Sequence, residues 1–307
     1  PGSGSDLASA GTRAVRDGDE WVVNGQKVWN SAADMAQFGM LLARTDVDVP
    51  KHRGLSYFLI DMEQPGVEVR PLRQMDGRAA FCEVFLTDAR VPHDRLVGEL
   101  GGGWKVAQTT MANERAMVAN RTATGLVAAR SGARGDLHTP IASLVAPARQ
   151  ASARRIPGGA VPTLLMLELA RERGAHVDPV IRQRLAAYYA QNKVNSWLNR
   201  RIGAALGRLT GADGSLAKLA TSRVCQVSRD LSLAIMGASG MLDLDDAPMH
   251  GELTRVGLAS PGTRIGGGTD EIQLNLIGER GLGLPKEPAT DIDTPYRDVR
   301  VGTQARV

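Results

Sequence analysis

Aromatic side chains are scarce in this sequence: only 4% of the 307 residues are Trp, Tyr or Phe, while the net charge is +4. A nucleic-acid groove normally combines a concentrated basic patch with interleaved aromatic side chains. Here the basic excess comes from scattered arginines, so the composition argues against nucleic-acid binding. A modest positive charge of this kind suits a small polyphosphate ligand.

Cysteine is equally rare, and neither Cys82 nor Cys225 has the spacing of a CxxC motif or a metal-ligand set. The sequence therefore predicts two reduced, packed thiols in a cytoplasmic protein. The five histidines, including His93 and His138, show no pairing either. No metal site is predicted.

Long hydrophobic runs are missing as well. No run approaches the length of a membrane span, and the first residues, "PGSGSDLASAGTRAV", lack the apolar core of a signal peptide. We therefore expect no membrane span and a cytoplasmic location. The hydrophobic fraction of 43% is nevertheless sufficient for a substantial core, and the length suits two domains.

The first hundred residues carry strand signals, namely short β-rich runs separated by turn residues. One segment contains Asn24-Gly25, a dipeptide that favours a type I′ hairpin between two strands. This spacing predicts an all-β barrel or sandwich. The predicted strand segments are 20–32, 38–46, 54–62, 66–72 and 79–92.

The hydrophobic period becomes helical near residue 100. Asp178 is a good N-cap for one helix, and Thr269 or Asp270 for another. Residues 131–160 are predicted to form a loop or a broken helix. The predicted helices are 98–130, 162–174, 178–209, 214–237 and 269–283.

The order of these elements, strands first and helices afterwards, predicts an α+β multidomain protein rather than a doubly wound sheet. The Gly-x-Gly segments do not follow strands in a βαβ unit, so the dinucleotide-binding fingerprint is not met. We expect a β domain over 1–98, a helical bundle over 99–285 and a polar tail over 286–307.

Five stretches, in the same order, resemble motifs of the acyl-CoA dehydrogenase family. The family fold has an N-terminal helical domain, a middle β-barrel or sandwich domain and a C-terminal four-helix bundle. The resemblance covers the last two, and the sequence begins without Met, so we expect the N-terminal helical domain to be lacking. The stretches are "PGSGSD" (1–6), "VNGQKVWNSAA" (23–33), "VPHDRLVGELGGGWKVA" (91–107), "GSLAKLA" (214–220) and "GGGTDEIQLNLIGERGLGLP" (266–285).

The resemblance implies an enzyme that converts an acyl-CoA thioester into the trans-2-enoyl-CoA. In the family, a carboxylate removes the α-proton and the β-hydrogen leaves as hydride to N5 of FAD. FAD is therefore the implied cofactor, and electron-transfer flavoprotein is an implied partner. The implied assembly is a homodimer, a homotetramer or a heterotetramer with a second acyl-CoA dehydrogenase subunit.

The same resemblance implies the cofactor contacts. Trp29 matches the tryptophan that lies against the isoalloxazine, and Ser31 the hydroxyl near flavin N5 or O4. Thr269 and Glu271 match residues that contact FAD. The alternatives are a core tryptophan, a turn serine and a capping box without a ligand. Ser5 matches a position that approaches the CoA or flavin phosphates.

The position that many members use for the catalytic glutamate is Gly267 here, and glycine has no acid–base chemistry. Members that resemble isovaleryl-CoA and long-chain dehydrogenases carry the base on the first helix of the bundle. "MANERAMVA" (111–119) places Glu114 at that position, and Arg115 matches the arginine that supports the active-site loop. The N–H of Gly267 would still face the thioester oxygen. The alternative is that Glu114 is an ordinary exposed helix carboxylate.

Two departures from the family keep other functions open. In "AIMGASG", Ala234 replaces a glutamine of a motif that touches the FAD of a neighbouring subunit, although Gly237 and Gly240 remain. The stretch that grips the pyrophosphate is not recognisable, with Arg182 and Gln183 as stand-ins. These losses resemble an actinobacterial branch that acts on bulky CoA esters, including steroid side chains, and forms some α2β2 heterotetramers. One alternative is a non-catalytic or half-site subunit, and another is an acyl-CoA oxidase or a flavin monooxygenase.

Overall fold

The computed structural model describes residues 1–124, 159–204, 212–242, 247–288 and 291–299. The chain divides into two compact units. The β unit consists of Pro1–Asn113 together with Lys286–Val307, and the helical unit consists of Glu114–Pro285. The α+β class predicted from the sequence is confirmed.

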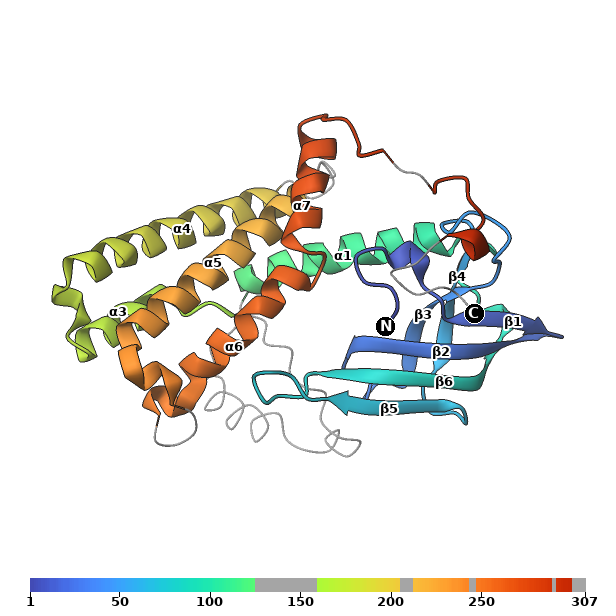
Figure 1. Cartoon of the computed structure of the whole chain (residues 1–307), viewed down its shortest axis with the longest axis horizontal. Helices are drawn as coiled ribbons and strands as arrows, with labels where there is room; N and C mark the ends of the chain where they lie inside the picture. Colours follow the sequence, from blue (N-terminus) through green and yellow to red (C-terminus); the bar gives the residue numbers. More distant parts are fainter. Residues whose placement is uncertain (125–158, 205–211, 243–246, 289–290, 300–307) are drawn as a thin grey trace. The chain divides into compact units, whose positions relative to one another are not determined.

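Six strands of the β unit form one mixed sheet in the order β4-β3-β1-β2-β6-β5 (Figure 1). Neighbouring strands are antiparallel, except that β1 runs parallel to β3. All five predicted strand segments contain a strand, while β1 was not predicted. The strands are β1 (Arg13–Asp17), β2 (Glu20–Ser31), β3 (Phe38–Arg44), β4 (Leu55–Asp61), β5 (Val67–Leu72) and β6 (Phe81–Pro92).

The hairpin predicted at Asn24-Gly25 is wrong, because β2 runs through this dipeptide without turning. The hairpin turn lies at Gly18 and Asp19, between the last pair of β1 and β2. Gly25 instead coincides with a register shift against β6, and its φ is +149°. A Cβ at Gly25 would lie 2.8 Å from Thr12 Oγ1. The glycine therefore marks a bulge with close backbone approach rather than a turn.

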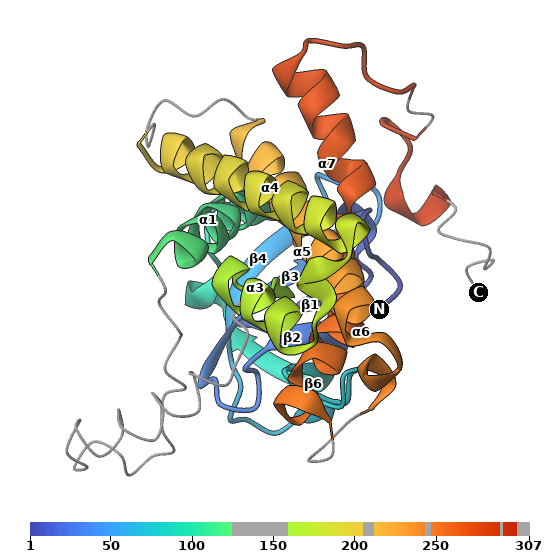
Figure 2. The same cartoon turned by 90° about the vertical axis from the view of Figure 1, so that its left-hand side faces the viewer.

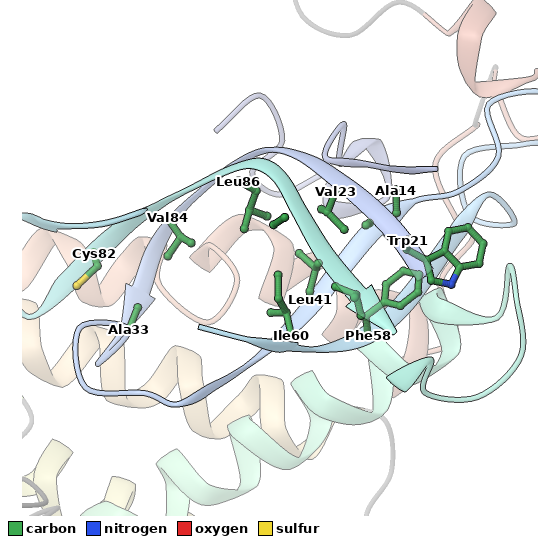
Figure 3. Close-up of a cluster of buried hydrophobic side chains, with 13 residues drawn as sticks. Ala14, Trp21, Val23, Ala33, Leu41, Phe58, Ile60, Cys82, Val84 and Leu86 are labelled. Atoms are coloured by element: carbon green, nitrogen blue, oxygen red, sulfur yellow. The ribbon is translucent and has the colours of Figure 1, made fainter. Parts of the chain in front are cut away.

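The core of the β unit is formed by inward-facing side chains of β1, β2, β3, β4 and β6 (Figure 3). Trp21 packs on Phe58 with ring centroids 5.4 Å apart, and its Nε1 donates to His93 Nδ1 at 3.1 Å. This bond gives His93 a structural partner. The cluster contains Ala14, Trp21, Val23, Ala33, Leu41, Ala43, Phe58, Ile60, Cys82, Val84, Leu86, Ala89 and Val91.

Residues 291–299, which we call the C-terminal strap, pack on the β unit. The buried Tyr296 donates its O–H to the Ser9 carbonyl at 3.2 Å. Its ring lies 3.7 Å from the Arg44 guanidinium. Asp291 pairs with Lys51 at 2.8 Å. The strap thus joins the N-terminal segment to β3.

Arg44 is the centre of this junction, and only 1% of its surface is exposed. Its guanidinium donates to the carbonyls of Ala8, Ala10 and Lys51. Tyr296 covers one face of the same group. A buried cation is tolerated here because backbone oxygens and an aromatic face replace its hydration.

The helical unit is built around α4 and α5, which pack along each other (Figures 1 and 2). The Asp178 cap is confirmed, since Asp178 Oδ1 accepts from the Val180 N–H at 2.7 Å. No helix in the described parts of the chain combines the length and apolarity needed to cross a bilayer. The helices are α1 (Gly103–Thr124, which contributes to both units), α3 (Thr163–Glu172), α4 (Pro179–Ala204), α5 (Asp213–Met236), α6 (Glu252–Ile265) and α7 (Asp270–Leu276).

The predicted helices correspond to α1, α3, α4, α5 and α7, but α6 was not predicted. Gly257, Pro261 and Gly262 lie within α6 and interrupt its apolar pattern. Nearly all of the predicted loop or broken helix at 131–160 lies outside the described residues.

The two cysteines are free and buried, as the sequence predicted. Cys82 belongs to the β-unit core. Cys225 lies on α5, where burial raises the pKa of its thiol to about 11. Such a thiol stays protonated at neutral pH and is a poor nucleophile.

Candidate active-site residues

Trp29 is turned outward by a bulge in β2. The pairing of β2 with β6 shifts between Lys27 and Asn30, and Trp29 has a φ of +65°. A left-handed backbone is unfavourable for a bulky aromatic residue. Trp29 is 60% exposed, and the Phe81 ring meets its indole edge-on, with the ring centroids 5.7 Å apart. The strand thus holds an exposed aromatic surface in a fixed place.

Two predicted serines also belong to the β unit. Ser31 is exposed at the end of β2, opposite Phe81 of β6. Ser5 is exposed in the N-terminal segment, beside Asp6. Burial alone would raise the pKa of Asp6, but hydrogen bonds from Ser9 at 2.6 Å and Lys51 at 3.0 Å outweigh it and lower that pKa. The carboxylate of Asp6 therefore stays charged, and its bonds to Ser9 and Lys51 anchor the N-terminal segment.

A glycine-rich loop, Gly266–Thr269, connects α6 to α7 in the helical unit. Gly267 and Gly268 both have a left-handed backbone, with φ of +69° and +89°. Thr269 is the N-cap of α7, because its Oγ1 accepts from the Ile272 N–H at 3.2 Å. Glu271 is exposed, and its Oε1 lies 3.5 Å from Nη2 of Arg264.

Asp270 does not cap the helix but enters a buried polar cluster. It accepts from Lys218 at 2.8 Å and Ser222 at 2.9 Å, both of α5, and from Arg264 of α6 at 3.3 Å. Burial alone would raise the pKa of Asp270, but these bonds and the Lys218 charge outweigh it and lower the pKa. The carboxylate joins three helices at the start of α7.

Replacing Asp270 by Asn should lower the free energy of unfolding at pH 7 by about 1.5–3 kcal/mol, because charge-assisted hydrogen bonds are lost. A depressed pKa stabilises the fold above the ordinary value of 3.8 and loses that effect as the pH falls through the folded-state value. The difference in unfolding free energy between wild type and Asp270→Asn, measured by urea titration, should therefore become smaller below the folded-state pKa of Asp270. Asp230→Asn is the matched control, because Asp230 is exposed on α5. This variant should have the unfolding free energy of wild type both at pH 7 and below the folded-state pKa of Asp270.

The predicted base, Glu114, lies exposed on α1 in the helical unit. The apolar surroundings that the family's base normally has are therefore not provided by its described neighbours. Arg115 follows it on α1, but its side chain lies outside the described residues. Gly237 ends α5 with a φ of +55°, and Ala234 is exposed one turn earlier.

The predicted residues thus fall into two sets. Trp29 and Ser31 share one strand of the β unit, while Gly267, Thr269 and Glu271 lie in the glycine-rich loop and the first turn of α7 in the helical unit. The sequence-based reasoning missed Phe81, Lys218 and Gln273. Asp270 and Gln273 are three positions apart on α7, a spacing that places both on one helix face. That spacing is a signal for Gln273 that the sequence contains.

Two family models match the chain. A family model for the acyl-CoA dehydrogenase middle domain matches residues 1–89, and one for the acyl-CoA dehydrogenase C-terminal domain matches residues 145–282. The chain belongs to the acyl-CoA dehydrogenase family.

Individual members of this family are similar to the chain over most of its length. The chain is 36% identical to acyl-CoA dehydrogenase IpdE1 of Mycobacterium tuberculosis over 94% of its own length and 66% of that protein. The Tcur3481-Tcur3483 steroid acyl-CoA dehydrogenase is 27% identical, with a TM-score of 0.74 over 94% of this chain and 67% of that one. The ChsE4-ChsE5 complex of Mycobacterium tuberculosis is 25% identical, with a TM-score of 0.66 over 94% of this chain and 68% of that one. The chain spans about two thirds of the length of these relatives.

Proposed function

We propose that the protein dehydrogenates an acyl-CoA thioester between its α and β carbons with FAD as cofactor. The family is generally FAD-dependent. The observation that carries the proposal is Trp29, an exposed indole held out from β2 by an unfavourable left-handed backbone. Such a residue fits a planar ligand, whose stacking offsets the strain and covers the ring.

Several groups are suited to hold FAD. Trp29 would stack on the isoalloxazine, and the exposed hydroxyl of Ser31 would donate to its polar edge. Thr269 Oγ1 accepts the Ile272 N–H, so its own hydrogen is still available for the cofactor. Glu271 and Gly237 complete the proposed set. When bound, FAD supplies the acceptor for the β-hydride.

Glu114 is proposed as the base that takes the α-proton from the thioester. Its carboxylate is exposed on α1, whereas Gly267 offers only a backbone N–H. That N–H would donate to the thioester oxygen as negative charge develops there, which lowers the barrier in the manner of an oxyanion hole. Proton removal by Glu114 and loss of the β-hydrogen leave the trans-2-enoyl-CoA.

The proposed substrate is a bulky acyl-CoA, with Ser5 near the CoA phosphates and Arg115 supporting the site. Support comes from the similarity to a protein described as a steroid acyl-CoA dehydrogenase. Electron-transfer flavoprotein is the proposed electron acceptor. A homo-oligomer or a heterotetramer is the proposed assembly.

A half-site subunit is the second candidate. Ala234 is exposed at the position of the family glutamine, so this side chain has no hydrogen-bonding group to offer a cofactor. A structurally similar protein is described as a two-component complex, ChsE4-ChsE5. FAD content of the chain purified alone and with a co-expressed neighbouring subunit separates the two candidates. Release of hydrogen peroxide in air would instead indicate an oxidase.

Trp29→Leu should weaken FAD binding by about 10–100-fold, because stacking of a heteroaromatic ring on an aromatic side chain contributes about 1–3 kcal/mol. It should also remove the quenching of flavin fluorescence by the indole. Titration of FAD into the full-length protein measures both effects. Trp197→Leu is a close control, since Trp197 is 61% exposed against 60% for Trp29 and lies on α4. Equal affinities for the two variants would refute the assigned role of Trp29.

A further inference from the structure

The glycine-rich loop has one open side and one filled side. A Cβ at Gly267 would meet nothing within 4 Å, and this residue is exposed. A Cβ at Gly268 would lie 2.4 Å from Gln273 Nε2. The side chain of Gln273 therefore fills the inner side, and a Cβ at position 268 would require its amide to shift.

Gln273 is fully buried, with 0% of its surface exposed. Its Nε2 donates to the Gly267 carbonyl at 3.1 Å, and its backbone N–H donates to the Thr269 carbonyl at 2.9 Å. Within the described residues, its Oε1 has no hydrogen-bond partner. A buried acceptor without a partner costs about 1–3 kcal/mol. An apolar side chain would avoid that cost, so the bond to Gly267 is what the glutamine contributes.

The other anchor of the loop is Asp270. Lys218 holds this carboxylate and also donates to the Arg264 carbonyl at 3.1 Å, just before the loop begins. The start of α7 and the end of α6 are thereby fixed to α5. Gly267, in contrast, is held by Gln273 through its carbonyl oxygen, and the residue stays exposed on its other side.

We infer that Gln273 is a positioning residue: by holding the Gly267 carbonyl it fixes the peptide that follows Gly267, and this restricts the rotation of the preceding peptide, whose Gly267 N–H is presented to the thioester oxygen. The inference rests on the proposed function, in which that N–H stabilises the developing charge. Donors of this kind are effective because they are already oriented before the reaction. Two consecutive glycines have many accessible backbone conformations. Without the hydrogen bond from Gln273, the loop would therefore lose the fixed orientation of the Gly267 N–H.

Gln273→Met tests the inference, since methionine is of similar length and has no N–H to donate. Calorimetry on the FAD-loaded full-length protein should compare a saturated acyl-CoA thioester with the matched S-alkyl-CoA thioether, which lacks the carbonyl oxygen. The variant should bind the thioester about tenfold more weakly, in line with one lost hydrogen bond. Its affinity for the thioether should be unchanged, whereas general damage would weaken both.

Gly268→Ala provides a second route, because its Cβ would push the Gln273 amide off the carbonyl while Gln273 remains. It should show the same selective loss. Gln191→Met, at an exposed position of α4, and Gly174→Ala, where a Cβ has free space but the φ of +67° is also left-handed, should bind both ligands like wild type. If wild type distinguishes the two ligands and both loop variants match it, the positioning role is wrong. If wild type does not distinguish them, the proposed function fails and this inference fails with it.

Discussion

Glu114→Gln is expected to lower turnover of an acyl-CoA by about 10²–10⁴-fold, the range typical for loss of a general base. Glutamine has nearly the same shape as glutamate but cannot accept the α-proton. FAD content and thioester affinity should stay at wild-type levels, because Glu114 is exposed and its assigned role is in proton removal alone. Anaerobic bleaching of the flavin by substrate measures the loss directly.

Glu168→Gln is the matched control, since Glu168 is an exposed glutamate on α3. It should bleach at the wild-type rate. Adding Gly267→Glu to the Glu114→Gln variant should restore part of the activity, because position 267 has free space for a side chain, although its φ of +69° makes the substitution strained. Wild-type turnover by Glu114→Gln would remove Glu114 from the mechanism.

Arg44→Met is expected to lower the free energy of unfolding of the β unit by about 3–5 kcal/mol. The change removes a buried cation and leaves the carbonyls of Ala8, Ala10 and Lys51 without their donor. Buried acceptors that lose a partner cost about 1–3 kcal/mol each. The methionine fills much of the volume, so the loss reports on hydrogen bonds rather than on a cavity.

Urea titration followed by tryptophan fluorescence measures this loss. A Trp197→Phe background leaves only Trp21, Trp29 and Trp104, all of the β unit, as probes. Arg90→Met is the control, because Arg90 is exposed and pairs with Asp17 and Glu20 at the surface. Such pairs contribute little to stability. An unfolding midpoint for Arg44→Met equal to that of the control would show that the strap junction does not stabilise the β unit.

The sequence predicted those elements whose pattern is local. The five strand segments and the helices around α4 and α5 have clear alternation or helical period. β1 was missed because only Ala14 of its five residues is buried, so the strand shows no alternation. The Asn24-Gly25 turn was wrong because the same dipeptide also suits a bulge. The choice between the two depends on pairing with β6, which is not encoded locally.

The same distinction applies to the candidate site. Trp29, Thr269 and Gly267 stand in motifs that can be read from the sequence. Lys218, by contrast, acts through a tertiary contact and lies 52 positions before Asp270. A lysine in one helix and an aspartate at the start of another have many plausible partners. Only the packing of α5, α6 and α7 selects this pair.

The C-terminal strap gives the molecule an unusual order of assembly. Ser9 and Tyr296 meet although they are 287 positions apart, with the whole helical unit between them. Translation at about 5–20 residues per second separates their synthesis by about 15–60 s. During that interval the nascent β unit lacks the ring that covers Arg44. The unit that is translated first is therefore the one that is completed last.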